Sequence, residues 1–517
     1  MRRPLSLLAV LAAVAAGSCA AAATPPNVTV NRDPGATDAH GVRLAVDPTD
    51  ASRLAVAYST GRSATSGSCL VAHSTDAGRT WESETVAGDA ARPLLPGTTH
   101  CADPALAFGA DGTLYVAYGV SRLGGPGRIY LTSSTDHGLT FRAATAVDPD
   151  PPDGGDFEPA IAAGPSSGTV SVAFERYGPD FEDAAVFAAT SHDGGRTVSA
   201  PVRVSPPREN AANGRASAAI DRGGNLYVAW VDAADVDFDG SGTAGLQVAV
   251  SRDAGRTFRA PIAVAALPSG CGPNDDCGNR YPAATAAAGA GGVADLAWSA
   301  GVYPDPARVF VSRTRDSGRS WTAPRPLAAP AGTADHDEFA PSMALAPDGR
   351  LDLGWADQAR DTDAGLLDVY LSYSLDGGRT FSTPRRLDDS PANTQQGSFA
   401  AALDVAASDG AAHAVWEGGA ILFARVGDGR PPRTPTVAGP RRVRSPTPRP
   451  SYRLGSSDDF TPQAALRFRC SFDGVPLHPC GRRYAQPLRP GRHVFHVRAV
   501  DRAGNRSAVT SVAVLVR

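Results

Sequence analysis

The chain has 517 residues, is 42% hydrophobic and carries a formal net charge of −4, values that are ordinary for globular proteins and allow two or three domains. All 49 basic residues are arginine, and alanine is abundant, as is typical of a GC-rich genome, so arginine is a weak indicator of function here. Beyond the N-terminus, no apolar run reaches the roughly 20 residues that a membrane-spanning helix needs.

The N-terminus has the layout of a secretory signal. Arg2 and Arg3 precede the apolar run Leu5–Ala16, and small residues follow. We therefore expect residues 1–22 to be a signal peptide and the mature chain to be secreted. Residues 16–19 resemble a bacterial lipobox without its usual leucine, so a lipid anchor at Cys19 is the alternative.

Six short segments recur at regular spacing along the chain. They share the pattern Ser/Thr-x-Asp-x-Gly-x-Thr/Ser, followed by an aromatic residue or valine. Their aspartates, 60, 57, 60, 63 and 60 residues apart, are Asp76, Asp136, Asp193, Asp253, Asp316 and Asp376. Each segment follows an alternating strand, so it is expected to form a hairpin loop. The carboxylate can accept hydrogen bonds from backbone amides of its own loop, and glycine supplies a positive φ.

These segments resemble the Asp box, or BNR repeat, of sialidases and other secreted β-propellers, and the resemblance spans about residues 27–426. It implies a β-propeller in which the boxes are structural and lie on the side away from the ligand site. A second repeat, two strands joined by a glycine turn, lies between the boxes; it is clearest at residues 103–118.

The second repeat occurs seven times, against six boxes, which favours a seven-bladed propeller over the six-bladed alternative. The seventh unit, residues 399–426, has only three candidate strands. Asn27–Val30 resembles the fourth strands of the other units, so we expect the N-terminal segment, at the start of domain 23–426, to complete that blade and remove its exposed edge.

Residues that precede the inner strands should converge on the face opposite the boxes, where loops on a rigid scaffold commonly carry function. A wider set on this face includes His100 and Asp103. The ligand contacts that we expect there are Asp156, Glu158, Arg215, Arg280, Tyr281, Asp337 and Glu338. Acids with arginine and tyrosine would form a polar pocket for hydroxyl-rich or charged ligands.

One loop on this side has a metal-binding pattern. Asp235, Asp237 and Asp239, followed by Gly240, match the start of a calcium loop, in which alternating carboxylates surround a hard cation. Position twelve is Leu246 rather than glutamate, so other groups would have to complete the site, and a plain acidic turn is the alternative. No cofactor other than this Ca²⁺ is expected.

The cysteines agree with export, because disulfides persist in oxidising compartments. No Cys-x-x-Cys pair occurs, which argues against zinc. Local spacing and the register of the boxes predict the pairs Cys69–Cys101, Cys271–Cys277 and Cys470–Cys480.

The tail changes composition. Residues 427–450 are rich in proline and arginine, as in a linker that runs into a new domain, and 451–517 show short alternating strands. This last segment resembles the Ig-like β-sandwich modules of bacterial surface proteins, which usually space or attach domains. Residues 434–517 contain 15 arginines and four aspartates, so this basic module could contact an anionic surface.

The resemblance leaves two functions open. Sialidases carry an Arg-Ile-Pro motif on the first blade, whereas this chain has Gly41–Leu44 there and no such motif elsewhere, so no catalytic residue can be assigned. The sequence therefore favours a monomeric secreted protein that binds an extracellular glycan, polymer or protein on the central face. The alternative is a glycoside hydrolase, either exo-sialidase-like or with paired carboxylates. Nucleic acid is not an expected partner.

Overall fold

The computed structural model describes most of the chain and is almost entirely β. Among the described residues, the one helical element is the 3₁₀ turn η3 (Gln463–Ala465), and none is long and apolar enough to cross a bilayer. The described ranges are 27–31, 39–61, 66–88, 98–122, 125–151, 154–179, 183–207, 213–233, 242–269, 284–301, 305–330, 336–361, 366–389, 392–393, 403–418, 420–445, 448–474 and 476–517.

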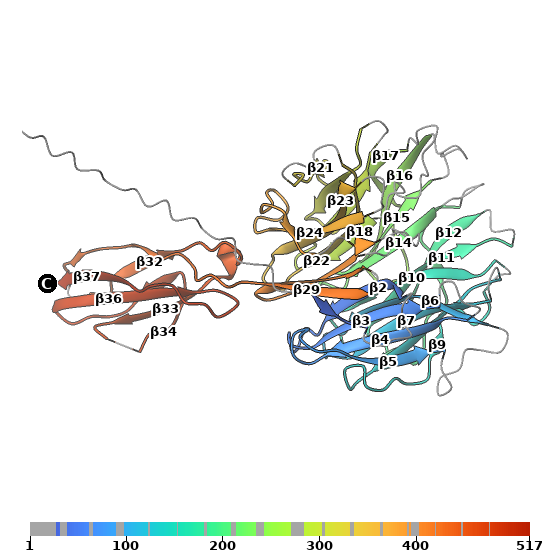
Figure 1. The fold of residues 1–517 in the computed structure, drawn as a ribbon. Helices are drawn as coiled ribbons and strands as arrows, with labels where there is room; N and C mark the ends of the chain where they lie inside the picture. Colours follow the sequence, from blue (N-terminus) through green and yellow to red (C-terminus); the bar gives the residue numbers. More distant parts are fainter. Residues whose placement is uncertain are drawn as a thin grey trace, which may run out of the picture.

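Seven antiparallel sheets occupy residues 28–427 (Figure 1). The first three, each from its inner strand outwards, are β2 (His40–Val46), β3 (Leu54–Thr60), β4 (Ser68–Ser74) and β5 (Glu82–Ala87); β6 (His100–Phe108), β7 (Leu114–Ser121), β8 (Arg128–Ser134) and β9 (Thr145–Ala146); and β10 (Asp156–Ala163), β11 (Val170–Tyr177), β12 (Ala184–Ser191) and β13 (Val202–Arg203).

The remaining four sheets continue the pattern. They are β14 (Asn213–Ile220), β15 (Leu226–Asp232), β16 (Gly242–Ser251) and β17 (Ile262–Ser269); β18 (Ala284–Ala288), β19 (Ala294–Ala300), β20 (Arg308–Thr314) and β21 (Arg325–Pro326); β22 (Glu338–Leu345), β23 (Leu351–Asp361), β24 (Leu366–Ser374) and β25 (Arg385–Arg386), with β26 (Ala392–Asn393) also on β24; and β27 (Leu403–Ser408), β28 (Ala411–Glu417), β29 (Ile421–Gly427) and β1 (Val28–Thr29).

The sheets form a closed ring, because their inner strands contact one another in the cycle β2, β6, β10, β14, β18, β22, β27 and back to β2. The N-terminal segment completes the last sheet, as expected: Val28 pairs with Phe423 and Thr29 with Leu422. Both ends of the propeller chain therefore share one sheet, which leaves β29 without an open edge.

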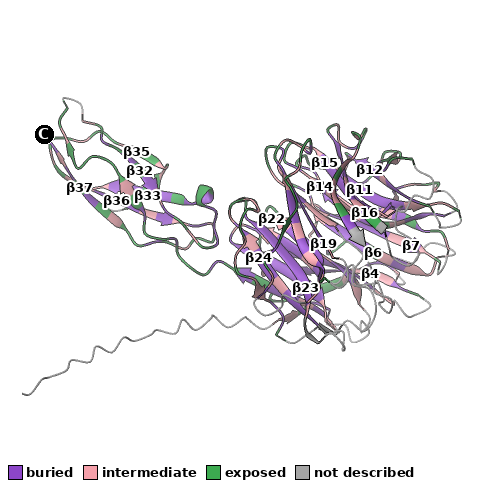
Figure 2. Cartoon of the chain, turned by 90° about the horizontal axis from the view of Figure 1, so that it is seen from above, coloured by how far each residue is buried: buried purple, intermediate pink, exposed green. Residues whose placement is uncertain are grey.

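The second strand of each sheet is buried at nearly every position, so both of its faces are covered (Figure 2). Each second strand carries a large aromatic side chain towards its end. In four of the seven sheets this residue is a fully buried tryptophan: Trp230, Trp298, Trp355 or Trp416. The inner strands are rich in alanine instead, as β14 and β18 show. Small side chains allow seven strands to approach one axis.

The six Asp boxes form the same hydrogen-bonded loop. In the first box, Asp76 Oδ1 accepts from the Thr80 amide at 2.9 Å and Asp76 Oδ2 accepts from Thr80 Oγ1 at 2.7 Å. Ser74 Oγ donates to Asp76 Oδ1 and accepts from the amide of Gly78, whose φ is +86°. These bonds lower the pKa of Asp76 to about 2. The boxes are therefore structural, as the resemblance implies.

The boxes lie at the opposite end of the sheets from the start of the inner strands. Ser74, at the first box, pairs with Leu54, and Leu54 pairs with Val46 at the end of β2. The loops that lead into the inner strands therefore open on the other face of the ring.

The C-terminal residues form two further sheets beside the propeller (Figure 1). One has the order β30 (Thr436–Ala438), β32 (Ser451–Gly455) and β35 (Arg483–Ala485). The other has the order β31 (Arg442–Val443), β37 (Thr510–Val516), β36 (Gly491–Val500), β33 (Arg467–Phe472) and β34 (His478–Cys480). Since β30 and β31 lie within residues 427–450, part of the expected linker is built into these sheets.

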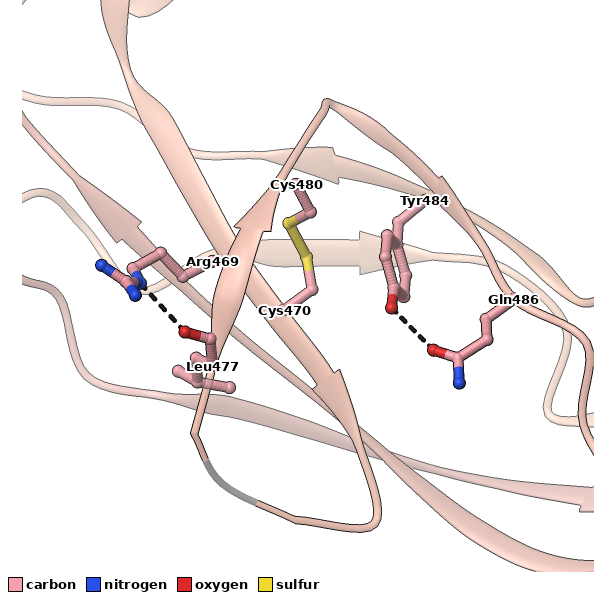
Figure 3. Close-up of a disulfide and its surroundings, with 6 residues drawn as sticks. All are labelled: Arg469, Cys470, Leu477, Cys480, Tyr484 and Gln486. Atoms are coloured by element: carbon pink, nitrogen blue, oxygen red, sulfur yellow. Dashed lines mark hydrogen bonds between the residues drawn. A yellow bond between two sulfur atoms is a disulfide. The ribbon is translucent and has the colours of Figure 1, made fainter.

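Two of the three expected disulfides lie in the described residues, and both are formed. Cys69–Cys101 joins β4 to β6 across neighbouring sheets, and Cys470–Cys480 joins β33 to β34 (Figure 3). Arg469, beside the second bridge, donates to the Leu477 carbonyl at 3.0 Å. Cys271, Cys277 and Cys19 lie outside the described residues.

Candidate functional site

Five of the seven inner strands have a β-bulge near their start, on the face opposite the boxes. The register shifts lie between His40 and Arg43, Ala102 and Ala105, Phe157 and Ala160, Gly214 and Ser217, and Phe339 and Ser342. Bulges redirect side chains out of the regular alternation of a strand, and they are frequent beside active sites.

The bulges hold non-glycine residues in the left-handed region of backbone conformation. Asp103, Glu158 and Ala340 have φ of +50°, +49° and +46°, and Gly41 occupies the equivalent place in β2 with +70°. Each of the first three precedes a proline. Such a conformation costs a side-chain-bearing residue about 1–2 kcal/mol, and strain of this kind is commonly retained at functional sites.

These bulges surround a cavity of about 320 Å³ on the axis of the ring. All seven inner strands contribute to its lining. Its polar and charged lining side chains are Arg43, Asp103, Glu158, Ser217, Thr285, Ser342 and Asp404. Asp103 and Glu158 are exposed, lie at equivalent positions of the neighbouring strands β6 and β10, and bring two carboxylates to the same cavity.

Asp404 connects three inner strands at this cavity. Its Oδ2 accepts from the Leu44 amide at 2.7 Å, and its Oδ1 accepts from Ser342 Oγ at 2.6 Å. Burial raises the pKa of Asp404, and the charge of Arg43 opposes that shift. Asp404 and Arg43 thus bring opposite charges to the cavity lining, in addition to the carboxylates of Asp103 and Glu158.

Of the predicted ligand contacts, Glu158 lies where the sequence placed it, in the cavity lining. Asp156 does not line the cavity. It is 1% exposed and accepts from Arg176 Nε at 2.7 Å and Nη2 at 2.9 Å, while Arg176 Nη2 also contacts Asp148. Burial is the main cause of the raised pKa of Asp156. This carboxylate therefore belongs to an internal ion-pair network.

Asp337 and Glu338 also differ from the expectation. Glu338 is fully buried, and its Oε2 accepts from the Val309 amide at 2.9 Å. Asp337 Oδ1 accepts from the Ala307 amide at 2.6 Å. Both side chains join β22 to the start of β20 in the preceding sheet, instead of facing the axis. Burial raises the pKa of Glu338.

Of the other predicted residues, one lies in a bulge and the rest lie outside the described residues. Arg215 lies in β14 within the bulge, beside the lining residue Ala216. Arg280 and Tyr281 lie outside the described residues, as do the predicted calcium ligands Asp235, Asp237 and Asp239.

The cavity also contains residues that the ligand predictions omitted. Asp103 belonged to the wider set on this face, whereas Arg43 and Asp404 were not proposed. The sequence does contain a signal for three of the bulges. An acidic residue or alanine is followed by proline at equivalent positions, in Asp103–Pro104, Glu158–Pro159 and Ala340–Pro341. The backbone before proline is restricted, so this repeat indicates an unusual local conformation.

The lining can hydrogen-bond hydroxyl groups and hold a charged group. Its two rim carboxylates accept hydrogen bonds, and the guanidinium of Arg43 donates them. Among the lining side chains that the structure describes, Arg43 is the one arginine. A cluster of arginines, which a sialidase uses to hold the carboxylate of its substrate, is thus not found among these described side chains.

Comparisons with known proteins find similar solved structures and one family of sequences. The chain is similar to an α-L-arabinofuranosidase from Fusarium graminearum (13% identity, TM-score 0.41, covering 64% of this chain and 93% of that one). It is also similar to the NanB sialidase from Streptococcus pneumoniae (11%, 0.42, 78% and 71%) and to an ulvan lyase, a polysaccharide lyase (14%, 0.46, 76% and 95%). No curated protein matches the chain in sequence. The model of the BNR repeat-like domain matches residues 28–293, more than half of the 517 residues, so the chain belongs to the family of BNR repeat-like domains.

Proposed function

We propose that this protein binds an extracellular glycan in the axial cavity. The observation that carries the proposal is the pair Asp103 and Glu158, two exposed carboxylates held at strained bulges on the rim of one cavity. A strained backbone that presents a polar side chain to a cavity is more economically explained by ligand contact than by folding, because glycine would fit the same conformation without strain.

The size and polarity of the cavity support a sugar ligand. A cavity of about 320 Å³ lies at the lower end of the range for small-molecule sites, so it suits one or two sugar residues at the end of a chain. Carboxylates bind pairs of sugar hydroxyls as acceptors, while the serine and threonine hydroxyls can donate or accept. Alanines of the inner strands provide flat apolar surface between these polar groups.

A paired-carboxylate glycoside hydrolase is the second candidate. The same two residues favour it, since most glycoside hydrolases use two acids on opposite sides of the bond that is cleaved. In that case Asp103 and Glu158 are the candidate acid and base, or acid and nucleophile. Their carboxyl groups would need to be about 5–5.5 Å apart for retention or roughly 6.5–9.5 Å apart for inversion.

The proposal includes an extracellular location. The disulfides Cys69–Cys101 and Cys470–Cys480 support it, because such bonds are rare in reducing compartments. In the same proposal the C-terminal β domain is an Ig-like module, and its arginine excess holds the protein at an anionic surface. This domain contacts the propeller on the Asp-box side, where Phe460 packs against Tyr373, and therefore not on the face where the inner strands begin.

Binding and catalysis are separated by one set of variants. The full chain, Asp103→Asn, Glu158→Gln and the control Glu82→Gln, an exposed acid on β5, are tested on a glycan array and with fluorogenic glycosides. Binding by the parent chain and the control, lost in both cavity variants without hydrolysis, supports the binding function. Turnover that both variants abolish supports the hydrolase. Equal binding by all four proteins would show that the axial cavity is not the site.

A further inference from the structure

Three aspartates from separate parts of the chain meet between the propeller and the C-terminal β domain. Asp428 follows β29 directly, Asp458 lies between β32 and η3, and Asp501 follows β36. One carboxylate oxygen of each lies within 4.8 Å of the others. This group, the junction aspartates, thus combines the last propeller strand with two loops of the C-terminal domain.

Two of these carboxylates have one oxygen occupied and the other unpaired. Asp458 Oδ1 accepts from the amides of Phe460 and Thr461 at 2.9 and 2.8 Å, and Asp501 Oδ1 accepts from the Asn505 amide at 2.7 Å. The Oδ2 atoms of Asp458 and Asp501 are buried without any hydrogen-bond partner. Asp501 is only 2% exposed. A buried carboxylate oxygen without a partner is strongly destabilising, so its retention points to a missing ligand.

Within the described residues, none of the junction aspartates forms an ion pair. Two nearby arginines pair with other acids, Arg430 with Asp459 at 3.0 Å and Arg502 with Asp409 at 3.4 Å. The charge of Arg350 acts on Asp428, but its guanidinium is hydrogen-bonded to Asp352. Burial and the charge of Asp458 raise the pKa of Asp428 to about 7. Three like charges at this spacing repel one another unless a cation or protons are bound.

We propose that the junction aspartates bind a divalent cation, with Ca²⁺ as the preferred ion. The ligand set consists of oxygen atoms, which suits hard cations. Ca²⁺ accepts irregular sets of six to eight oxygen ligands at about 2.3–2.6 Å, whereas Mg²⁺ requires a near-ideal octahedron. The three carboxylate oxygens lie within 4.8 Å of one another, close enough to contact one Ca²⁺. Thr461, fully buried beside Asp428 with its Oγ1 at 3.3 Å from Asp428 Oδ2, offers a fourth oxygen.

The consequence of this site is a rigid junction. Asn505 Nδ2 already donates to the carbonyl of Asp428 at 2.9 Å, so the last propeller strand and the loop after β36 are in direct contact. A cation shared by Asp428 and Asp501 would stabilise that contact and hold the C-terminal domain at a defined angle to the propeller. This role is independent of the axial cavity and of any ligand there.

Calorimetric titration of CaCl₂ into the metal-free full chain tests the site. All proteins carry Asp237→Ala, which removes the separately predicted calcium loop. We expect one Ca²⁺ per chain, and we expect Asp501→Asn and Asp458→Asn each to weaken binding at least about tenfold through the loss of a charged ligand. The matched control is Asp459→Asn, the exposed neighbour, which should bind like the parent.

Near-ultraviolet circular dichroism shows whether each variant is folded. Folded Asp501→Asn or Asp458→Asn protein with unchanged Ca²⁺ affinity would overturn the proposal, as would a parent chain that shows no Ca²⁺ binding up to millimolar concentration. If both substitutions prevent folding, the unfolding temperature of the parent chain is measured with and without CaCl₂. A rise with CaCl₂ in both the parent and Asp459→Asn supports the site, and no rise in the parent refutes it.

Discussion

The guanidinium carbon of Arg350 lies 4.2 Å from the centre of the Phe460 ring, and this contact joins the propeller to the C-terminal β domain. Arg350 is fully buried, bound by Asp352 Oδ1 at 2.7 Å and Oδ2 at 2.9 Å, and donates to the carbonyl of Ala411 at 2.8 Å. The ring of Phe460 also packs edge-on against Tyr373 at 4.7 Å. One aromatic side chain thus covers a charged network that would otherwise face solvent.

Replacing this aromatic side chain should loosen the junction. We expect Phe460→Ala to destabilise the C-terminal part of the chain by about 3 kcal/mol, because it removes a buried aromatic ring and a cation–π contact. Thermal unfolding and limited proteolysis measure the effect, and new cleavage is expected between residues 427 and 450. The control Leu139→Ala removes an exposed side chain and should change neither measurement. If Phe460→Ala changes neither the unfolding temperature nor the cleavage pattern, the contact contributes little to the stability of the junction.

Each Asp box should contribute measurably to stability. In the third box, Asp193 accepts from the amide and the hydroxyl of Thr197 at 2.9 and 2.6 Å, and from Ser191 Oγ at 2.9 Å. We expect Asp193→Ala to lower the free energy of unfolding by about 1–3 kcal/mol, since it leaves backbone and hydroxyl donors without their acceptor. Asp150→Ala, at an exposed loop position, is the control. Urea unfolding compares the three proteins.

The boxes should also make stability sensitive to acid. The ordinary pKa of aspartate is 3.8, and hydrogen bonds from threonine, serine and backbone groups lower the pKa of Asp76, Asp136 and Asp253 to about 2. A carboxyl whose pKa is lower in the folded state stabilises the fold above the unfolded pKa and loses that effect as pH falls. We therefore expect unfolding midpoints to fall steeply between pH 4 and pH 2.

The variant Asp136→Asn tests whether the box aspartates cause this loss of stability at low pH. In Asp136→Asn protein the loss between pH 4 and pH 2 should be smaller than in the parent, because one titrating carboxylate is gone. An equally steep loss would mean that other acids cause it.

The strain at the bulges can be separated from the role of the side chain. Glu158→Ala and Glu158→Gly both remove the carboxylate, but only glycine relieves the positive φ of +49°. We expect the glycine variant to be more stable than the alanine variant by about 1 kcal/mol, while neither binds ligand. Chemical denaturation gives the difference. Equal stability of the two variants would mean that the bulge is not strained.

Much of the architecture follows from the sequence because the signals are local and repeated. A box places its aspartate within four residues of the donors that it binds, as Asp76 and Thr80 show, so its structure depends little on distant residues. The pairing of Val28–Thr29 with β29 was also predictable, because seven inner units and six boxes leave one strand missing.

The direction of the acidic side chains was decided by tertiary structure. Asp156 and Glu158 are two residues apart, yet Asp156 is buried against Arg176 and Glu158 reaches the axial cavity. Glu158 lies in a bulge that breaks the alternation of the strand. Glu338 precedes an inner strand as expected, but the amide of Val309 in the neighbouring sheet captures its carboxylate.

The sequence by itself thus determined the repeat, the number of inner strands and the closure of the ring, since these depend on short-range hydrogen bonds and hydrophobic alternation. Only the tertiary structure decided which charges share a site. Asp428, Asp458 and Asp501 are separated by 30 and 43 residues, and they meet because the C-terminal domain folds back against the last propeller strand. Packing between sheets and domains sets such distances, and no local pattern encodes them.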